Sequence, residues 1–264
     1  MTPEARRIAH RALELFGAAV EPDAAVVHVL ALWKDPSGPL RVLRIDADAP
    51  RSATDRFVLG LARARADALL TSGAILAAEP ELRLEIGGTG EERAELKAWR
   101  REVMGSTQPL FGGVMTRNAN LDLDHPFFEK GERTAIYTTS EAAAALEARA
   151  EERGIALLPR ATPNAADAIV ALREHFGARA VGIELGAGAS RPLYGEAPEM
   201  PGAAGLDELW LSLYEEPALP RERTSDAFFT LAQLEEMFPA SSTPVVSNEE
   251  SGRWSVRRMR RRGA

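Results

Sequence analysis

The chain has 264 residues, of which 45% are hydrophobic, enough for a substantial buried core. Its net charge of −7 offers no general attraction to nucleic acids or anionic membranes, so we expect a small-molecule substrate and a second copy of the chain as partners. The absence of cysteine excludes disulfides, thiolate metal sites and cysteine nucleophiles. Neither a signal peptide nor an apolar run of the ~18 residues that a membrane helix needs is recognisable, which predicts a cytoplasmic protein.

The N-terminal part of the sequence predicts one helix followed by two strands. Apolar residues at helical spacing predict a helix over residues 2–16 that ends at Gly17. The apolar run 24–33 is typical of a strand buried on both faces, and the turn sequence DPSGP separates it from a second strand over 40–46.

The stretch SATDRFVLGLARARADALLTSG predicts a helix that leads into a buried strand. Ser52 can cap the helix, and Asp55, three residues further on, can act as its partner in a variant of the capping box. Residues 67–73 then form a buried strand. The order strand, helix, strand is that of a right-handed parallel crossover.

Helices and strands alternate through the middle of the chain. We expect a helix capped by Thr89 and Glu92 that ends near Met104, strands 109–118 and 133–139, a helix from Ser140 to Gly154, a strand 155–159, a helix capped by Asn164 and Asp167 and ended by Gly177, and a strand 178–185. This alternation predicts an α/β fold with an open, mainly parallel sheet and helices on both faces.

The C-terminal part predicts a different arrangement. Strands 206–216 and 253–261 lack a crossover helix between them, which indicates an antiparallel hairpin at one edge of the sheet. The arginine-rich end of the chain could contact RNA or an acidic partner, but we favour the exposed face of an edge strand, where charge prevents edge-to-edge pairing. We predict a helical extension over residues 1–23 and one domain over 24–264, with 191–205 as a surface loop inside it.

Two glycine-containing turns follow strands, at the edge of the sheet where α/β proteins bind ligands. The first contains Ser72 and Gly73. The second, IELGAGAS, contains Gly186 and Gly188, and we weigh phosphate binding equally against a simple turn there. The sequence GGTG at 87–90 lacks the partners of a phosphate loop and is interpreted as a flexible turn.

Histidines and acidic residues do not form a recognisable metal site or catalytic triad. The four histidines are far apart in the sequence, and His28 lies in an apolar strand, where we expect a hydrogen-bonded core residue. The segment LDLDHPFFE at 121–129 gathers acidic residues and a histidine, but a turn explains it better than a metal site.

The stretch 52–80 resembles a segment of the bacterial riboflavin-biosynthesis reductase domains, which are relatives of dihydrofolate reductase. Further segments are similar to that family's strands in the same order, so that the resemblance spans residues 24 to 262: 114–128, 134–139, 180–186, 206–213 and 251–261. The residues that match in the first stretch are Ser52, Asp55, Arg56, Arg65, Asp67 and Glu79.

The resemblance implies a dihydrofolate-reductase-like fold, a homodimer, and NADPH bound across the carboxyl ends of the strands. It implies reduction of a pyrimidine whose phosphoribosylamino group becomes ribitylamino, or of a pterin-like substrate, with no metal. The zinc deaminase domain that often accompanies this family needs cysteines that the chain lacks. The residues expected to bind the cofactor are Ser72, Gly73, Glu184, Gly186, Gly188 and Ser190, and those expected on the substrate side are Asp35 and Asp55.

The sequence also departs from the family pattern. Where the family has G-x-x-T-x-R, this chain has Ser72, Ile75 and Ala77, and Leu185 replaces the first glycine of E-G-G. Asp35 is weighed equally as a substrate contact and as an ordinary turn residue. These departures support an alternative, a catalytically degenerate member of the fold that acts as a binding or regulatory module, and they leave the choice between NADPH and NADH open.

Overall fold

A computed structural model describes residues 1–23, 25–36, 38–44, 49–195, 205–220 and 223–261. The chain divides into two compact units, the first made of Met1–Arg65, Ile86–Gln108 and Leu206–Ala264, the second of Ala66–Glu85 and Pro109–Gly205. Part of the predicted strand 40–46 and most of the predicted loop 191–205 lie outside the described residues.

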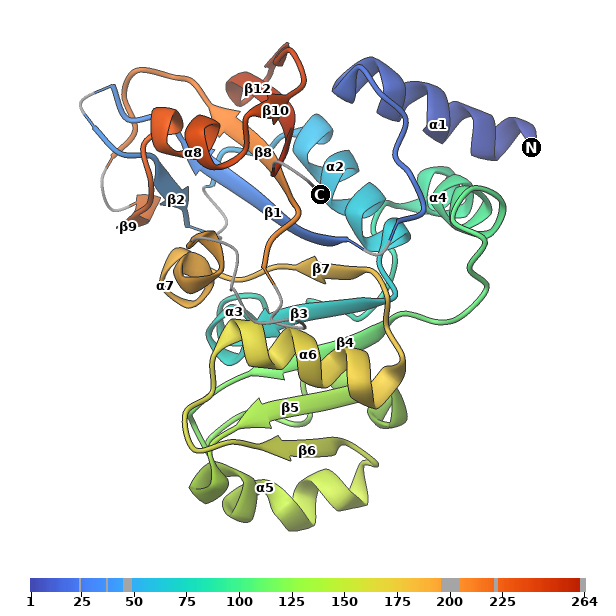
Figure 1. Cartoon of the computed structure of the whole chain (residues 1–264), viewed down its shortest axis with the longest axis vertical. Coiled ribbons are helices and arrows are strands. Elements are labelled where there is room, and N and C mark those ends of the chain that lie inside the picture. Colours follow the sequence, from blue (N-terminus) through green and yellow to red (C-terminus); the bar gives the residue numbers. More distant parts are fainter. Residues whose placement is uncertain (24, 37, 45–48, 196–204, 221–222, 262–264) are drawn as a thin grey trace. The chain divides into compact units, whose positions relative to one another are not determined.

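Within the described residues, the first unit combines a mixed sheet with several helices (Figure 1). Its elements are α1 (Pro3–Phe16), β1 (Val26–Trp33), β2 (Arg41–Leu43), α2 (Ala53–Arg65), α4 (Gly90–Glu102), β8 (Glu208–Tyr214), β9 (Thr224–Ala227), α8 (Leu231–Met237), β10 (Ala240–Ser241), β11 (Val245–Glu249) and β12 (Gly252–Arg260). β1 runs parallel to β8, from Val27 opposite Glu208 to Trp33 opposite Tyr214. β8 is antiparallel to β12, β12 is antiparallel to β10 and β11, and β2 joins β1 to β9.

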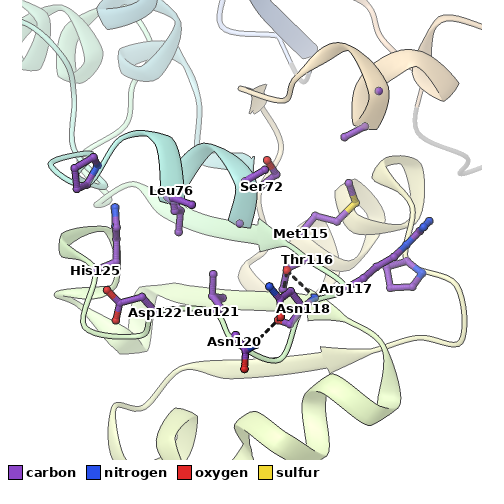
Figure 2. Close-up of a pocket in the computed structure, with 17 residues that line it drawn as sticks. Ser72, Leu76, Met115, Thr116, Arg117, Asn118, Asn120, Leu121, Asp122 and His125 are labelled. Atoms are coloured by element: carbon purple, nitrogen blue, oxygen red, sulfur yellow. Dashed lines mark hydrogen bonds between the residues drawn. The ribbon is translucent and has the colours of Figure 1, made fainter. Parts of the chain in front are cut away.

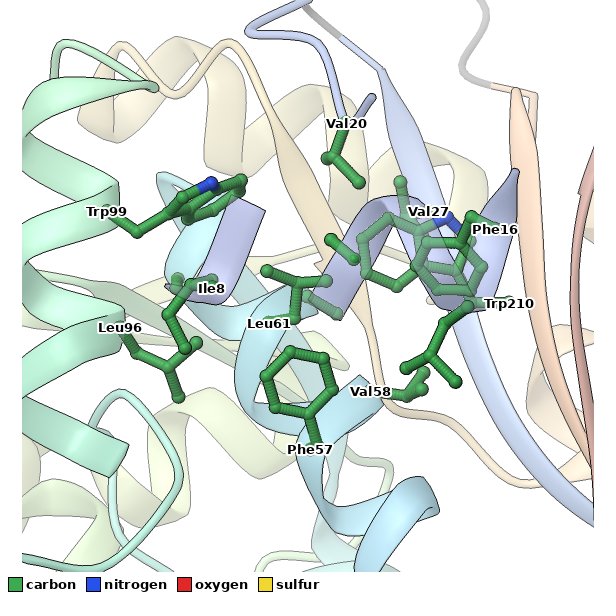
Figure 3. Close-up of a cluster of buried hydrophobic side chains, with 14 of the residues drawn as sticks. Ile8, Phe16, Val20, Val27, Phe57, Val58, Leu61, Leu96, Trp99 and Trp210 are labelled. Atoms are coloured by element: carbon green, nitrogen blue, oxygen red, sulfur yellow. The ribbon is translucent and has the colours of Figure 1, made fainter. Parts of the chain in front are cut away.

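The hydrophobic core of the first unit lies between the sheet and helices α1, α2 and α4 (Figure 3). Ile8 and Phe16 project from α1, and the Phe16 ring lies 4.9 Å from that of Trp210 on β8. Phe57 from α2 and Trp99 from α4 complete this contact surface and are fully buried. The apolar stripe of the N-terminal helix therefore belongs to the core, while the predicted domain boundary after residue 23 stays a prediction.

The arginine-rich strand β12 is not the exposed edge strand that its sequence suggested. It has β8 on one side and β10 and β11 on the other, and its residues are mostly buried. Acidic side chains from other elements pair with its arginines: Arg257 with Glu235, and Arg258 with Glu208. The alternation of arginines reflects internal ion pairing, which a one-dimensional pattern cannot distinguish from an exposed charged edge.

The second unit contains a fully parallel sheet in the order β7–β3–β4–β5–β6. Its strands and α-helices are β3 (Ala68–Ser72), α3 (Gly73–Ala78), β4 (Phe111–Met115), β5 (Thr134–Thr138), α5 (Ser140–Glu152), β6 (Ala156–Pro159), α6 (Ala165–Phe176), β7 (Val181–Ile183) and α7 (Ala187–Ser190), with 3-10 turns η1 (Pro126–Phe128), η2 (Gly131–Arg133) and η3 (Arg191–Tyr194). The predicted alternation of strands and helices is confirmed in this unit, which shows the parallel α/β arrangement (Figure 1).

Glycines on the central strand β4 allow close packing on both of its faces. A Cβ atom on Gly112 would lie 2.8 Å from the ring of Phe127, and one on Gly113 would lie 2.8 Å from Leu172 of α6. Real Cβ atoms do not come this close to a neighbour, so a larger residue at either position would force Phe127 or Leu172 to move. The sheet is therefore covered directly by α6 on one face and by the turn that carries Phe127 on the other.

Most helix termini follow the predicted residues, and the start of α4 does not. Asn164 caps α6 through the N–H of Asp167 at 2.9 Å, and Gly177 ends it in the left-handed conformation, as predicted. Helix α5 begins at Ser140 as predicted, with Thr139 as its N-cap, whereas Thr89 forms no side-chain cap on α4. No helix in the described ranges is long and apolar enough to cross a membrane.

Helix α2 is capped partly from far along the chain. The hydroxyl of Ser52 accepts a hydrogen bond from the N–H of Asp55 at 2.9 Å, as predicted for the N-cap. The carboxylate of Glu249 in β11 accepts two hydrogen bonds at this helix start, from the N–H of Ala53 at 2.6 Å and from the Ser52 hydroxyl at 2.8 Å. Part of the cap of α2 thus comes from a residue that no local pattern identifies.

Candidate functional site

A pocket of about 740 Å³ lies in the second unit where strands β3 and β4 end (Figure 2). Ser72 and Met115, the last residues of these strands, are paired in register and both line it. The other lining residues are Gly73, Ala74, Leu76, Ala77, Pro80, Thr116, Arg117, Asn118, Asn120, Leu121, Asp122, His125, Pro163, Gly188 and Ala189. Its position agrees with the rule that open α/β sheets bind ligands beyond the carboxyl ends of their strands.

The polar segment that follows β4 is ordered by its own hydrogen bonds (Figure 2). Thr116 Oγ1 accepts the N–H of Asn118 at 3.0 Å, and Asn118 Oδ1 accepts the N–H of Asn120 at 2.8 Å. Further on, Asp122 Oδ1 accepts the N–H of Asp124 at 2.9 Å. The segment is therefore preorganised, and its polar residues Thr116, Asn118 and Asn120 line the pocket.

Arg117 carries the positive charge of this pocket. It is exposed, and among the described lining residues it is the one with a lysine or arginine side chain. A guanidinium group presents several donors in a planar fork that fits the oxygens of a phosphate. The pocket can therefore attract an anionic group beside apolar surface from Leu76, Met115 and Leu121.

Two glycines shape the walls of the pocket. A Cβ atom on Gly73 would lie 3.1 Å from Thr116 Oγ1 and 3.3 Å from Leu121, so glycine allows the first turn of α3 to approach the segment after β4. A Cβ atom on Gly188 would meet nothing within 4 Å. A side chain at position 188 would consequently enter open space at the pocket wall.

His125 has a structural role at the edge of the pocket. Its Nδ1 accepts the N–H of Phe127 at 3.1 Å and thereby caps the turn η1. Its Nε2 lies 2.9 Å from the carbonyl oxygen of Glu79, which assigns the ring proton to Nε2. In the part of the chain that the structure describes, no three histidine, cysteine or acidic residues come together as metal ligands.

The structure brings together half of the residues predicted to bind a cofactor. Ser72, Gly73 and Gly188 line the pocket. Glu184, Gly186 and Ser190 belong to the same unit but are not among the lining residues, and the Ser190 hydroxyl donates to the carbonyl oxygen of Gly186 at 3.1 Å. Their roles in cofactor binding stay predictions.

Leu185, the departure from E-G-G, is 2% exposed and does not line the pocket. Its side chain packs inside the protein. The leucine therefore does not narrow this pocket.

The predicted substrate-side residues lie in the first unit. Asp35 forms an ion pair with Arg41 at 3.5 Å across the turn between β1 and β2. Asp55 is half-buried in the first turn of α2. Burial raises the pKa of the Asp55 carboxyl, the nearby Ser212 hydroxyl lowers it in part, and the negative charge of Glu249 raises it further.

Sequence reasoning missed the polar segment 116–122 as a source of ligand contacts. A usable signal was present: the polar run TRNANLD directly follows the apolar part of the expected strand, and the carboxyl ends of parallel strands meet at one edge of the sheet. The strand 109–118 was predicted three residues too long at this end, since β4 ends at Met115. That overlap placed the first three residues of the polar segment inside an expected strand.

Comparison with known proteins identifies the fold. Neither a protein-family model nor a curated protein sequence matches the chain. Among solved structures, it is similar to a pyrimidine reductase-like protein from Corynebacterium diphtheriae, with a TM-score of 0.67, 15% identity, and coverage of 96% of this chain and 99% of that one. Acinetobacter baumannii RibD matches with a TM-score of 0.57 and 14% identity over 90% of this chain.

The riboflavin biosynthesis reductase Rib7 of Saccharomyces cerevisiae matches with a TM-score of 0.52, 12% identity, and coverage of 92% of both chains. The chain spans 58% of the length of the Acinetobacter RibD chain. The predicted resemblance is confirmed at the level of the fold. The chain has the dihydrofolate-reductase-like α/β fold of these reductases, with a mostly parallel sheet and an antiparallel hairpin.

Proposed function

We propose that this chain is an NADPH-dependent reductase that acts on a pyrimidine bearing a ribosylamino group, as in riboflavin biosynthesis. The observation that carries the proposal is the pocket at the ends of β3 and β4, inside a fold shared with pyrimidine reductases. Its volume of about 740 Å³ is within the range of small-molecule sites. The cofactor would supply the hydride, so the protein's task is to bind and orient both reactants.

The lining residues fit one part of a phosphorylated dinucleotide. Apolar side chains such as Leu76 and Met115 suit a planar ring, and the amides of Asn118 and Asn120 can form hydrogen bonds with it. Arg117 would pair with a phosphate group. Because NADPH carries one phosphate more than NADH, a cation at the pocket favours NADPH.

We further propose that Asp35 and Asp55 act on the substrate side and that two copies of the chain form a homodimer. The family resemblance supports both proposals. Sedimentation equilibrium on the purified chain tests the second, with a twofold mass expected. A mass equal to that of one chain over the micromolar range would contradict it.

The decisive experiment is titration of the purified protein with NADPH, and separately with NADH, followed by nicotinamide fluorescence. We expect saturable micromolar binding of NADPH and a stabilisation of a few kcal/mol at saturation. Arg117→Met should weaken binding, whereas Arg149→Met, which removes the same charge from an exposed position on α5, should not. No binding of either cofactor up to millimolar concentration would contradict the proposal.

A second function follows from the sequence of α3. Ala77 lines the pocket at the position where the family pattern has arginine, and Ile75 replaces its threonine. The pocket thus lacks part of the usual polar contact surface for a dinucleotide. A fold that retains the pocket without dinucleotide affinity would act as a binding or regulatory module, and the same titration distinguishes the two functions.

A further inference from the structure

Asp122 is the acidic residue among the described side chains that line the pocket beyond β3 and β4. Figure 2 shows it on the same side of the pocket as His125, with Arg117 on the other side and Leu121 between them. The pocket therefore offers a negative and a positive charge that are separated by apolar surface. A ligand that fits both charges carries a hydrogen-bond donor at one end and an anionic group at the other.

The orientation of the Asp122 side chain is set by its own segment of backbone. Its Oδ1 accepts the N–H of Asp124 at 2.9 Å, which leaves Oδ2 available as an acceptor. The preceding residue, Leu121, is buried in the core cluster that also contains Leu76. Asp122 itself is exposed to solvent at the pocket wall. Its carboxylate is therefore both held in place and accessible to a ligand.

The charge of Asp122 has no neighbouring cation as an ion-pair partner in the described part of the chain. Asp124, the next carboxylate along the chain, pairs with Arg153 instead. The ring of His125 does not serve either, because both of its nitrogens already contact backbone groups. A carboxylate in this state forms a charge-assisted hydrogen bond when a ligand donates to it.

For a reductase that binds NADPH, the position of Arg117 decides which ring lies in the pocket. The phosphate proposed above to pair with Arg117 is carried by the ribose that also holds adenine. Adenine is therefore the ring closest to Arg117. It presents apolar faces and, at one edge, an exocyclic amino group that donates hydrogen bonds. Leu76 and Leu121 provide apolar surface for the faces, and Asp122 provides an acceptor for the amino group.

Resting on the reductase function proposed above, we infer that Asp122 is a specificity residue that selects adenine as the base of the bound dinucleotide. Its carboxylate accepts a hydrogen bond from the amino group at C6 of adenine. Hypoxanthine carries an oxygen at this position, and two acceptors that face each other repel and lack a donor between them. Asp122 therefore distinguishes two cofactors that differ only in the base and share the nicotinamide and the phosphates.

The test compares NADPH with reduced nicotinamide hypoxanthine dinucleotide phosphate in titrations followed by nicotinamide fluorescence. Both ligands carry the same fluorescent group, so the ratio of their dissociation constants reports on the base alone. In the unmodified protein we expect NADPH to bind roughly fivefold or more tightly, the effect of one hydrogen bond to an exposed charged group. Asp122→Asn keeps an oxygen that can accept the N–H of Asp124 but removes the charge, and it should bring the ratio close to one.

Asp124→Asn is the matched control. It makes the same substitution two residues further on, at a carboxylate that does not line the pocket and pairs with Arg153. Removal of either negative charge changes the affinity for every anionic ligand, but this general effect cancels in the ratio. We expect Asp124→Asn to retain the preference for NADPH. The inference would be overturned by an equal loss of preference in both variants, or by equal affinity of the unmodified protein for the two cofactors.

A titration with fragments separates failure of this inference from failure of the proposed function. Calorimetry with adenosine 2′,5′-bisphosphate and with inosine 2′,5′-bisphosphate measures base selection without the nicotinamide. If neither dinucleotide binds but the adenosine compound binds more tightly than the inosine compound, the reductase function is overturned and the selection by Asp122 stands. If NADPH binds and neither pair of ligands shows a base preference, the inference is overturned and the proposed function stands. Absence of binding by all of these ligands would overturn both.

Discussion

Removal of the negative charge of Glu208 should destabilise the first unit strongly. Glu208 is 0% exposed and accepts hydrogen bonds from Arg258 Nε at 2.8 Å, Arg258 Nη2 at 2.7 Å and Trp210 Nε1 at 2.8 Å. Arg260 lies 3.1 Å and Arg65 4.0 Å from the same carboxylate. Glu208→Gln keeps the shape of the side chain but leaves the buried guanidinium of Arg258 without its counter-charge.

The expected loss of unfolding free energy follows from the burial of both Glu208 and Arg258. Breaking a buried ion pair by removal of one partner typically costs about 3–5 kcal/mol, because an uncompensated charge remains. A domain of this size is usually stable by only about 5–15 kcal/mol, so the variant should unfold at clearly lower urea concentration.

Urea unfolding followed by tryptophan fluorescence measures the difference. The matched control is Glu235→Gln, which breaks an ion pair with Arg257 on the same strand, but with Glu235 50% exposed. A solvent-exposed ion pair of this kind contributes only about 0–1 kcal/mol to the free energy of unfolding. A cost for Glu208→Gln no greater than that of Glu235→Gln would refute the electrostatic reasoning.

The ion pair between Glu208 and Arg258 also makes the stability of the protein depend on pH. Burial raises the pKa of Glu208, but the hydrogen bonds and charge of Arg258, the charge of Arg65 and the indole of Trp210 outweigh it, so the pKa is lowered in the folded protein. The folded state therefore binds this proton less readily than the unfolded chain, whose glutamates titrate near ~4.3. The stabilisation is complete above that pH and is lost as pH falls through the lower, folded-state pKa, a loss that Glu208→Gln should not show.

Three further predictions concern the second unit. Gly113→Ala places a methyl group 2.8 Å from Leu172 and should cost about 1–3 kcal/mol in urea unfolding, whereas Gly188→Ala, which meets nothing within 4 Å, should change stability little; equal effects would contradict the packing described for β4. Gly188→Leu should weaken NADPH binding in the fluorescence titration while the melting temperature is preserved, and unchanged affinity would place the dinucleotide elsewhere. Arg117→Met should weaken the binding of NADPH roughly tenfold or more and the binding of NADH much less, since a hydrogen bond to a charged group contributes about 1.5–3 kcal/mol. Equal losses of affinity for the two cofactors would show that Arg117 does not recognise the additional phosphate.

Much of the fold was predictable because its signals are local. The capping of α6 by Asn164 and its end at Gly177 depend on hydrogen bonds and backbone angles within a few residues. Apolar runs of strand length alternated with capped helices, and that order specifies a parallel sheet whose ligand edge is at the strand ends. The sequence alone therefore indicated the side of the sheet where Ser72 and Gly73 now line a pocket.

The tertiary structure decided the contacts between residues far apart in the chain. Glu249 caps a helix that begins 196 residues earlier at Ala53, and Arg258 pairs with a glutamate 50 residues before it. Neither contact follows from helical or strand periodicity, because a pattern shows which residue types recur and not which partners they meet. For the same reason the arginines of β12 resembled an exposed edge, although folding places this strand between other strands and pairs Arg258 with the buried carboxylate of Glu208.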